Sequence, residues 1–504
     1  MRTRSSAFVG YDVEVGAPFH VHWEWVDSGV AHAVDGRRFR RVSEQRHSPG
    51  VKIARGQSAL RSLRKERVMQ LRLIRRAAGL LASTLFVAAT PVAAQTISID
   101  NVTIVDVTNG RLQSRKTIVI EGNRIARIEN SNAATHAAAT LDGSGMFVIP
   151  GLWDMHIHAY FTNDTARFHS TSEVMLPLFV VNGITGVRDL GSNLEATLGA
   201  RDSIAAHTLI GPRMMVSGPM LDGPTTKYQA AIKVTTADDA RAAVRMLKER
   251  GVNMIKTQSL IPREAYFAIS DEAQKIGIPF EGHVPNSVTA LEAIKAHQSS
   301  FEHLIGVSDT NTLLIAELTR TRVWQCPTVV NSVGTPAEFL ADPGLPFWLK
   351  QGVEGWRKTA VTQAAATDSA AKATKARADR RLGFIKKLYD LKIPFLAGTD
   401  APAGYDLVPG ASLHRELQLF VRAGLTPLQA LQTATLNPAI FFDKTAEWGT
   451  IAPGKVADLV VLAHNPLVDI ANTRGVVAVV ADGRYYSPRE LDRMRLRIME
   501  LAGK

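Results

Sequence analysis

The chain has 504 residues, of which 45% are hydrophobic and 21% are charged. These proportions are ordinary for a globular protein with a sizeable core, so neither disulfides nor a metal ion is needed merely to hold the fold. The single cysteine, Cys326, excludes an intramolecular disulfide and a cysteine-rich zinc module.

The positive charge of the chain, +12 in total, is concentrated at the N-terminal end. Residues 1–94 contain 16 Lys+Arg and 7 Asp+Glu, a net charge of +9, which leaves about +3 for residues 95–504. A basic stretch confined to one end is a property of a tail or a targeting segment. The rest of the chain has no basic cluster interleaved with aromatic residues, so the sequence predicts no nucleic-acid partner.

A secretory leader is predicted at residues 69–94. Three arginines follow Met69, an apolar run extends from Ala77 to Ala89, and small residues precede the expected cleavage site after Ala94. The alternative, a membrane-spanning helix, is disfavoured because the run is shorter than the ~20 residues that cross a bilayer. Residues 1–68 indicate either an over-extended start or a poorly ordered extension. We expect a protein exported to the periplasm, with no stable membrane anchor after cleavage.

Two β-rich segments flank the rest of the mature chain. Residues 96–130 alternate apolar and polar side chains, with hairpin turns expected at Asn-Gly 109–110 and Gly-Asn 122–123. The same pattern returns at Val456–Leu462 and Val476–Tyr486, where Asp-Gly forms a turn. These two segments can pair into one small β domain.

Between them, short apolar runs alternate with helical stretches. This alternation predicts a parallel sheet with crossover helices, and about eight such units suit a (β/α)8 barrel. The predicted fold is therefore α/β, with a TIM-like barrel at 149–445, a small β-sandwich domain from 95–148 and 446–490, and a C-terminal tail at 491–504. The expected strand runs include Gly183–Asp189, Arg213–Gly218, Asn253–Lys256, Ile278–His283, Ser300–His303, Val323–Val329 and Ile393–Asp400.

The first barrel strand should end in the sequence PGLWDMHIH, residues 150–158. Residues i and i+2 face the same side of a strand, so His156 and His158 point together at the C-terminal end, where barrel active sites form. Two imidazoles placed in this way can bind one metal ion, although an isolated HxH is a weak signal.

Four other candidate ligands end later runs: Lys256, His283, His303 and Asp400. Taken singly, each could be a surface-facing strand end or a hydrogen-bonded core group. The C-terminal ends of all barrel strands meet at one mouth, so together these residues predict a shared site.

This ordered set of six residues resembles the metal-dependent amidohydrolase superfamily. More narrowly, it is similar to the imidazolonepropionase-related branch, which includes Xaa-Pro dipeptidases and metal-dependent carboxypeptidases. The resemblance covers about residues 96–485 and extends to the segments VRDLG, EGHVP, FEHL, AGTDAP and GTIAPGKVADLVVL. It implies an enzyme that hydrolyses an amide-type C–N bond, and export, which the leader predicts, points to a dipeptide, an N-acyl amino acid or a related amide as the substrate.

The resemblance also implies two divalent metal ions, expected to be Zn²⁺. By the same resemblance, Lys256 is expected to be N-carboxylated and to bridge the two ions. This is chemically reasonable because an ammonium group repels cations, whereas a carbamate is an anionic oxygen ligand. The more buried ion would be held by His156, His158 and Asp400, and the other by His283 and His303. By hypothesis, the ions lower the pKa of a shared water, and Asp400 accepts its proton and passes it to the leaving nitrogen.

The residues that determine substrate specificity should lie in the loops after the strands. Arg188, Tyr228 or Lys227 could pair with a substrate carboxylate, but Arg188 could equally be an ion-pair partner of Asp189 or Glu302. Cys326 is expected to be packed in the core. The remaining histidines that were considered fit no ligand position and are expected at the surface or in packing: His169, His207, His297 and His414.

Several rival functions remain open at this point. An ester or a lactone could be hydrolysed by the same activated water. Deamination of a cyclic amidine is disfavoured because deaminases of this superfamily usually lack the bridging lysine. A non-catalytic binding scaffold should have lost ligands, and none of the six is missing. The expected partner is a small amide or peptide, and a homo-oligomer is not excluded.

Overall fold

The computed structural model describes residues 96–131, 137–333, 368–403 and 407–502. The extension predicted at 1–68 and the leader predicted at 69–94 lie outside these residues. Across the described ranges, no helix is both long and apolar enough to cross a membrane.

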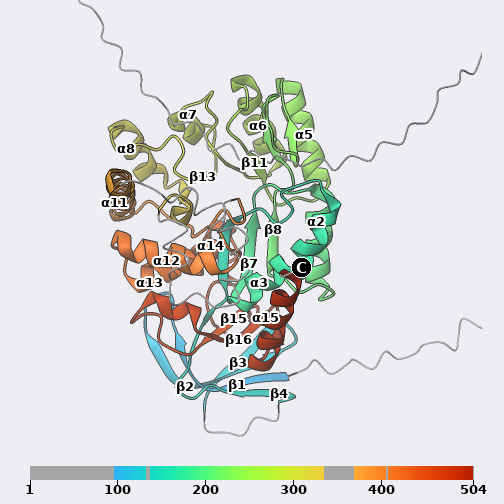
Figure 1. Cartoon of the computed structure of the whole chain (residues 1–504), viewed down its shortest axis with the longest axis vertical. Helices are drawn as coiled ribbons and strands as arrows, with labels where there is room; N and C mark the ends of the chain where they lie inside the picture. The colour runs from blue at the N-terminus through green and yellow to red at the C-terminus, as the bar shows by residue number, and fades with distance from the viewer. Residues whose placement is uncertain (1–95, 132–136, 334–367, 404–406, 503–504) are drawn as a thin grey trace, which may run out of the picture. The chain divides into compact units, whose positions relative to one another are not determined.

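Strands from the two ends of the described chain form one hydrogen-bonded sheet, drawn in blue and red in Figure 1. Its order is β17-β16-β15-β5-β1-β2-β3, and β4 also pairs with β1. The ends are joined where β5 runs antiparallel to β15, with Ile149 opposite Val460. The strands are β1 (Thr96–Val105), β2 (Leu112–Glu121), β3 (Arg124–Asn130), β4 (Ala139–Asp142), β5 (Phe147–Pro150), β15 (Leu459–Leu462), β16 (Val476–Ala481) and β17 (Arg484–Tyr486).

Alternate residues of the central strands of this sheet enter two different cores. Val148 and Val461 pack in the core of the β domain, whereas Ile149 and Val460 join the core shared with the barrel. A strand that is buried on both faces reads as a continuous apolar run rather than as an alternation. This explains why β15 has the sequence LVVL.

Eight parallel segments follow one another around a ring. β6, β7 and β8 form one sheet, and β9, β11, β12, β13 and β14 form part of a second sheet. β8 and β9 follow one another along the chain and both contact the run that contains β11, so together they count as one segment of the ring. The amide of Asn253 donates to the last residue of β8 (2.8 Å), which connects the two sheets. The bridges Gln325–Phe395 and Ile157–Ala401 add an eighth segment and close it on β6. The ring agrees with the (β/α)8 fold that the sequence predicts.

The run expected at Ile393–Asp400 is joined to its neighbours by these isolated bridges and by backbone hydrogen bonds, such as those from Met155 N–H to Ala397 O (2.8 Å) and from Leu396 N–H to Gln325 O (2.9 Å). It ends in a left-handed turn at Asp400 (φ +68°). The strands of the barrel region are β6 (Leu152–Ile157), β7 (Ile184–Asp189), β8 (Arg213–Val216), β9 (Met220–Asp222), β10 (Ala231–Lys233), β11 (Ile255–Thr257), β12 (Phe280–Gly282), β13 (Ser300–Glu302) and β14 (Trp324–Cys326).

Helices cover the outside of the ring, and α5 and α6 pack side by side (Figure 1). Thr236 and Asp239 form a capping box that starts α5, and Gly277 ends α6 in the left-handed region. The helices are α2 (Thr165–Ser170), η1 (Thr171–Met175), α3 (Leu176–Val181), α4 (Leu194–Ala205), α5 (Ala237–Glu249), α6 (Arg263–Ile276), α7 (Ala290–Lys295), α8 (Thr312–Thr321), η2 (Val329–Asn331), α11 (Asp368–Asp390), α12 (Ala411–Ala423), α13 (Pro427–Thr433), α14 (Leu436–Phe441), η3 (Ile470–Arg474) and α15 (Pro488–Ala502).

The segment that the sequence left as a tail, 491–504, is helical as far as Ala502. Leu491 and Ile498 are buried, and Met494 packs beside them. Residues spaced three and four apart share one face of a helix, so these side chains form the stripe that holds α15 on α3 and β16.

Candidate metal centre

The two histidines of the HxH motif lie side by side at the end of β6, where every residue is buried. Their ring centroids are 5.3 Å apart. Asp400, at the end of the eighth segment, brings its Oδ1 to 3.0 Å from His158 Nε2 and 3.4 Å from His156 Nε2. These three side chains place one potential ligand atom each within 4.8 Å of one another.

Two histidines that directly follow β12 and β13 join this group. The ring of His303 lies 4.7 Å from that of His156, and the ring of His283 lies 4.9 Å from that of His303. The structure therefore brings together the four histidines and Asp400 that the strand-end pattern singled out.

All four rings use Nδ1 for a contact within the protein. His156 Nδ1 donates to Glu302 (2.7 Å) and His158 Nδ1 to the carbonyl of Gly191 (3.0 Å). His283 Nδ1 contacts Ser259 Oγ (2.9 Å) and His303 Nδ1 contacts Thr328 Oγ1 (2.5 Å). Such contacts fix the orientation of a metal-binding imidazole and leave its Nε2 available.

Lys256 ends the run before His283 and is only 1% exposed. Its Nζ has no hydrogen-bond partner among the described residues. Burial lowers the pKa of Lys256 to about 8, although the nearby carboxylates of Glu302 and Asp400 oppose this shift. A buried amine without a partner is expensive, so this nitrogen fits a group that the polypeptide does not supply.

The backbone around Asp400 is held by residues that the sequence analysis did not single out. Asp154, on β6, accepts both the backbone N–H (3.0 Å) and the hydroxyl (2.7 Å) of Thr399. Asn331 donates to Asp400 Oδ2 (2.7 Å). A side chain at Gly398 would collide with the neighbouring strands, since its Cβ would lie 2.5 Å from Cys326 Sγ.

Glu302 is the most consequential residue that the sequence analysis did not assign to the site. One of its oxygens accepts from His156, and the other accepts from Arg188 Nη2 (2.9 Å). Arg188 also pairs with Glu281 (3.0 Å) and donates from Nε to the carbonyl of Met155 (2.6 Å). The only sequence signal for Glu302 was its place in the strand immediately before a candidate ligand.

The position of Arg188 decides between the two roles considered for it. Its side chain is fully buried, and its charge is already paired with two carboxylates inside the barrel. These carboxylates raise its pKa, against the opposing effect of burial. The pairing with Glu302 was one of the alternatives, and it leaves no exposed nitrogen for a substrate carboxylate.

Tyr228 lies near the mouth and is 42% exposed. Its ring is 5.5 Å from that of Phe161, which in turn is 4.7 Å from that of His158. Lys227 is exposed. Tyr228 is thus placed where a substrate could touch it, and its role remains a prediction.

The other residues weighed in the sequence are accounted for by packing or exposure. Cys326 is buried, and burial raises the pKa of its thiol. His414 is buried between Thr473 and the carbonyl of Asn182. His169, His207 and His297 are exposed.

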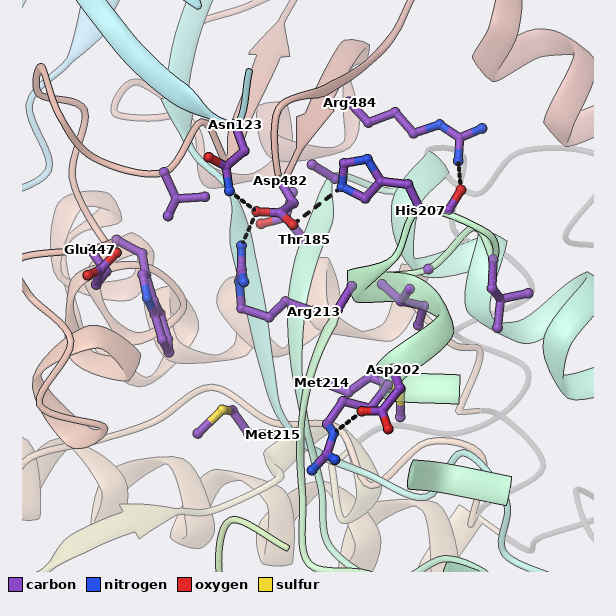
Figure 2. Close-up of a pocket in the computed structure, with 18 of the residues that line it drawn as sticks. Asn123, Thr185, Asp202, His207, Arg213, Met214, Met215, Glu447, Asp482 and Arg484 are labelled. Carbon is purple, nitrogen blue, oxygen red and sulfur yellow. Dashed lines mark hydrogen bonds and ion pairs between the residues drawn. The ribbon is translucent and has the colours of Figure 1, made fainter. Parts of the chain in front are cut away.

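A separate cavity of about 400 Å³ lies where the β domain meets the start of β7 and β8, and the candidate ligands do not line it. Figure 2 shows Asp482 at its centre, between Asn123, Arg213 and His207. In this cavity Arg213 is paired with Asp482 and Arg124 with Glu447, whereas Lys256 at the mouth has no such partner among the described residues.

Residues 147–485 match the amidohydrolase family. The chain belongs to this family. Among curated proteins it is similar to an adenine deaminase of Lysinibacillus sphaericus (strain C3-41), with 25% identity over 371 residues, which are 73% of this chain and 53% of that protein. The chain thus spans about half the length of such relatives.

Solved structures of amidohydrolases share the fold. A putative prolidase from Bifidobacterium longum is 25% identical, with a TM-score of 0.62, over 81% of this chain and 99% of that one. A Xaa-Pro dipeptidase with methionine bound in its active site is 22% identical, with a TM-score of 0.60, over 78% of this chain and 100% of that one. The family and fold predicted from the strand-end residues are therefore confirmed.

Proposed function

We propose that the chain is an exported hydrolase that uses two divalent metal ions, expected to be Zn²⁺, to cleave an amide-type C–N bond in a small molecule. The observation that carries this proposal is the buried group at the barrel mouth. Four imidazoles directed by their Nδ1 contacts, one carboxylate and one unpartnered lysine surround the same space.

The residues present fit such a metal centre. His156, His158 and Asp400 would hold one ion, and His283 and His303 the other. Lys256, carboxylated by carbon dioxide, would join the two, and its buried, unpartnered Nζ is suited to that modification. Bound divalent ions would make water acidic enough to act as a nucleophile near neutral pH and would polarise the scissile carbonyl.

Residues of the protein would carry out the proton transfer. Asp400 is the group placed to accept a proton from the attacking water and return it to the departing nitrogen, because its Oδ1 faces the histidines. Asn331 holds the other carboxylate oxygen and so limits rotation of the side chain. An amide nitrogen leaves poorly without protonation, so a proton carrier beside the nucleophile matters.

The proposal extends to processing and organisation. The mature enzyme would begin after Ala94 and act in the periplasm, with its barrel at 149–445 and its β domain at 95–148 and 446–490. Dipeptides, N-acyl amino acids and related amides are the proposed substrates. The dipeptidase and prolidase among the structural neighbours support this class.

Ester or lactone hydrolysis is the first alternative, since the same residues would serve it. Deamination gains some support from the similarity to adenine deaminases. We rank it lower because the buried Lys256 fits a bridging ligand that deaminases of the superfamily usually lack. A non-catalytic scaffold is disfavoured because all six candidate ligands lie together.

The test uses the purified full-length chain, loaded with zinc in the presence of bicarbonate. We expect about two metal ions per chain and hydrolysis of at least one member of a panel of dipeptides, N-acyl amino acids and lactones. His283→Ala should abolish turnover, whereas His464→Ala, at an exposed position, should retain it. Full activity in His283→Ala, or a protein that takes up no metal, would refute the proposal.

A further inference from the structure

Asp222 ends β9 on the inner wall of the barrel. Met220, two residues earlier, reaches the site: a Cβ at Gly191 would lie 2.5 Å from Met220 Cε and 3.3 Å from His158 Nδ1. Residues i and i+2 share one face of a strand, so Asp222 projects to the same side as Met220. Asp222 lies two residues closer than Met220 to the C-terminal end of the strand, where the mouth of the barrel opens.

Asp222 is completely buried, and only one of its two carboxylate oxygens has hydrogen-bond partners among the described residues. Its Oδ1 accepts the backbone N–H groups of Gly223 (2.9 Å) and Leu260 (2.8 Å). Its Oδ2 has no hydrogen-bond partner among the described residues. Because the two amides fix the orientation of the group, Oδ2 is a preset acceptor that lacks a donor.

Tyr228 connects this acceptor with the metal-ligand group. Burial raises the pKa of Tyr228, and the negative charges of Asp400 and Asp222 raise it further. Both carboxylates therefore lie within electrostatic reach of the same phenol. Asp222 is absent from the groupings of described side chains that could hold a metal ion, so its buried, unpartnered oxygen is not counted among the candidate metal ligands.

We propose that Asp222 Oδ2 binds an ammonium group of the substrate, so that the enzyme prefers amides that carry a free amine. This inference rests on the proposed function, because it names a substrate class for the same site. A carboxylate only accepts hydrogen bonds, and an ammonium group is the donor that also neutralises its charge. The amine can be the α-amine of a short peptide or the amine of a basic side chain.

Three matched sets of substrates separate these cases. The first has a free α-amine (Ala-Leu and Ala-Pro), the second is the N-acetylated form of each, and the third carries N-acetyl-lysine in place of alanine. Wild-type kcat/KM should be roughly 10- to 100-fold higher for the set whose ammonium reaches Asp222 than for the N-acetyl-alanyl set, the range expected for one hydrogen bond to a charged group.

The variant Asp222→Asn retains the oxygen that accepts the two backbone amides and removes the charge. It should bring the ratio between the amine-bearing and acetylated sets close to one. Asp271→Asn, the same change at an exposed site on α6, should preserve the wild-type ratio. Melting curves establish that each variant is folded, and Asp222→Ser replaces Asp222→Asn if the latter is not.

A wild-type ratio near one, or a preference that survives in Asp222→Asn, overturns the inference and leaves the proposed hydrolase intact. Calorimetry measures binding of the same peptides, so it tests the inference even if the proposed peptidase activity is absent. If no peptide is hydrolysed, tighter binding of the amine-bearing set that depends on Asp222 supports the inference while the peptidase proposal falls. Equal binding of the sets, or no binding, overturns the inference.

Discussion

The two ends of the barrel use buried charge in opposite ways. At the base, Arg213 pairs with Asp482 (2.8 Å) and Asp458 (3.5 Å), so the protein itself supplies charged partners for the arginine in the cavity of Figure 2. At the mouth, Lys256 Nζ and Asp222 Oδ2 have no partner among the described residues. The base thus joins two parts of the fold, whereas the mouth is arranged for groups that the polypeptide does not provide.

The sharpest test of this contrast is Lys256→Gln. It removes the nitrogen that would carry the bridging carbamate, so we expect the loss of at least one metal ion and a fall in kcat/KM of about 1000-fold, equivalent to roughly 4 kcal/mol of barrier. Elemental analysis and steady-state kinetics measure both. Lys275→Gln, at an exposed position on α6, is the control. A Lys256→Gln enzyme with two ions and normal turnover would show that this lysine is structural.

The next effect concerns Glu302, which orients His156 and also pairs with Arg188. Glu302→Gln should weaken metal binding by about 10- to 100-fold, the usual cost of losing a partner behind a metal-binding histidine. It should also lower the melting temperature, because Arg188 then has only Glu281 as a charged partner. Competition with a chelator measures the metal affinity. Unchanged affinity relative to Glu249→Gln, an exposed control, would contradict the orienting role.

At the base, a smaller effect is expected and it should not reach the chemistry. Arg213→Gln breaks the pairs with Asp458 and Asp482 and should lower the free energy of unfolding by about 1 kcal/mol, since the arginine side chain is 28% exposed and solvent screens it. The kcat/KM of the folded variant should match that of the wild type. A large loss of activity at unchanged stability would show that the base communicates with the mouth.

The smallest effect is the pH dependence of this same pair. Burial raises the pKa of Asp482, but the charge of Arg213 and the hydrogen bonds with Arg213, Asn123 and His207 together outweigh burial and hold the pKa below its ordinary value of 3.8. A lowered folded-state pKa stabilises the protein above about pH 4, and this contribution disappears as the pH falls through the folded value. Wild type should therefore exceed Asp482→Asn in unfolding free energy at pH 6, and the difference should shrink as the pH is lowered below about 4. A difference that grows on acidification would contradict this sign.

Much of the site could be predicted from the sequence because its residues sit where local patterns are informative. The spacing of His156 and His158 in one strand fixes that they face the same way, whatever surrounds them. The apolar runs before His283 and His303 predict that both stand at strand ends, and the barrel brings those ends together. The turns at 109–110, 122–123 and 482–483 were equally local, and strands β1–β2, β2–β3 and β16–β17 flank them.

Other features depended on contacts between distant residues. The sequence predicts only a tail at residues 491–504, because the apolar stripe of α15 can be explained only by its contacts with α3 and β16. The contact that orients His156 joins it to Glu302, 146 residues later. Likewise, the ion pairs of Arg188 with Glu281 and Glu302 decided between two roles that the sequence left equal.

The sequence by itself determined which side chains end the strands and which way they face, because strand periodicity is a local property of the backbone. Only the tertiary structure decided which of those side chains are satisfied by the protein and which are left without a partner. That distinction depends on where donors and acceptors from separate strands meet. It is what sets Lys256 and Asp222 apart from Arg188, although the three strands that carry these residues are all short and completely buried.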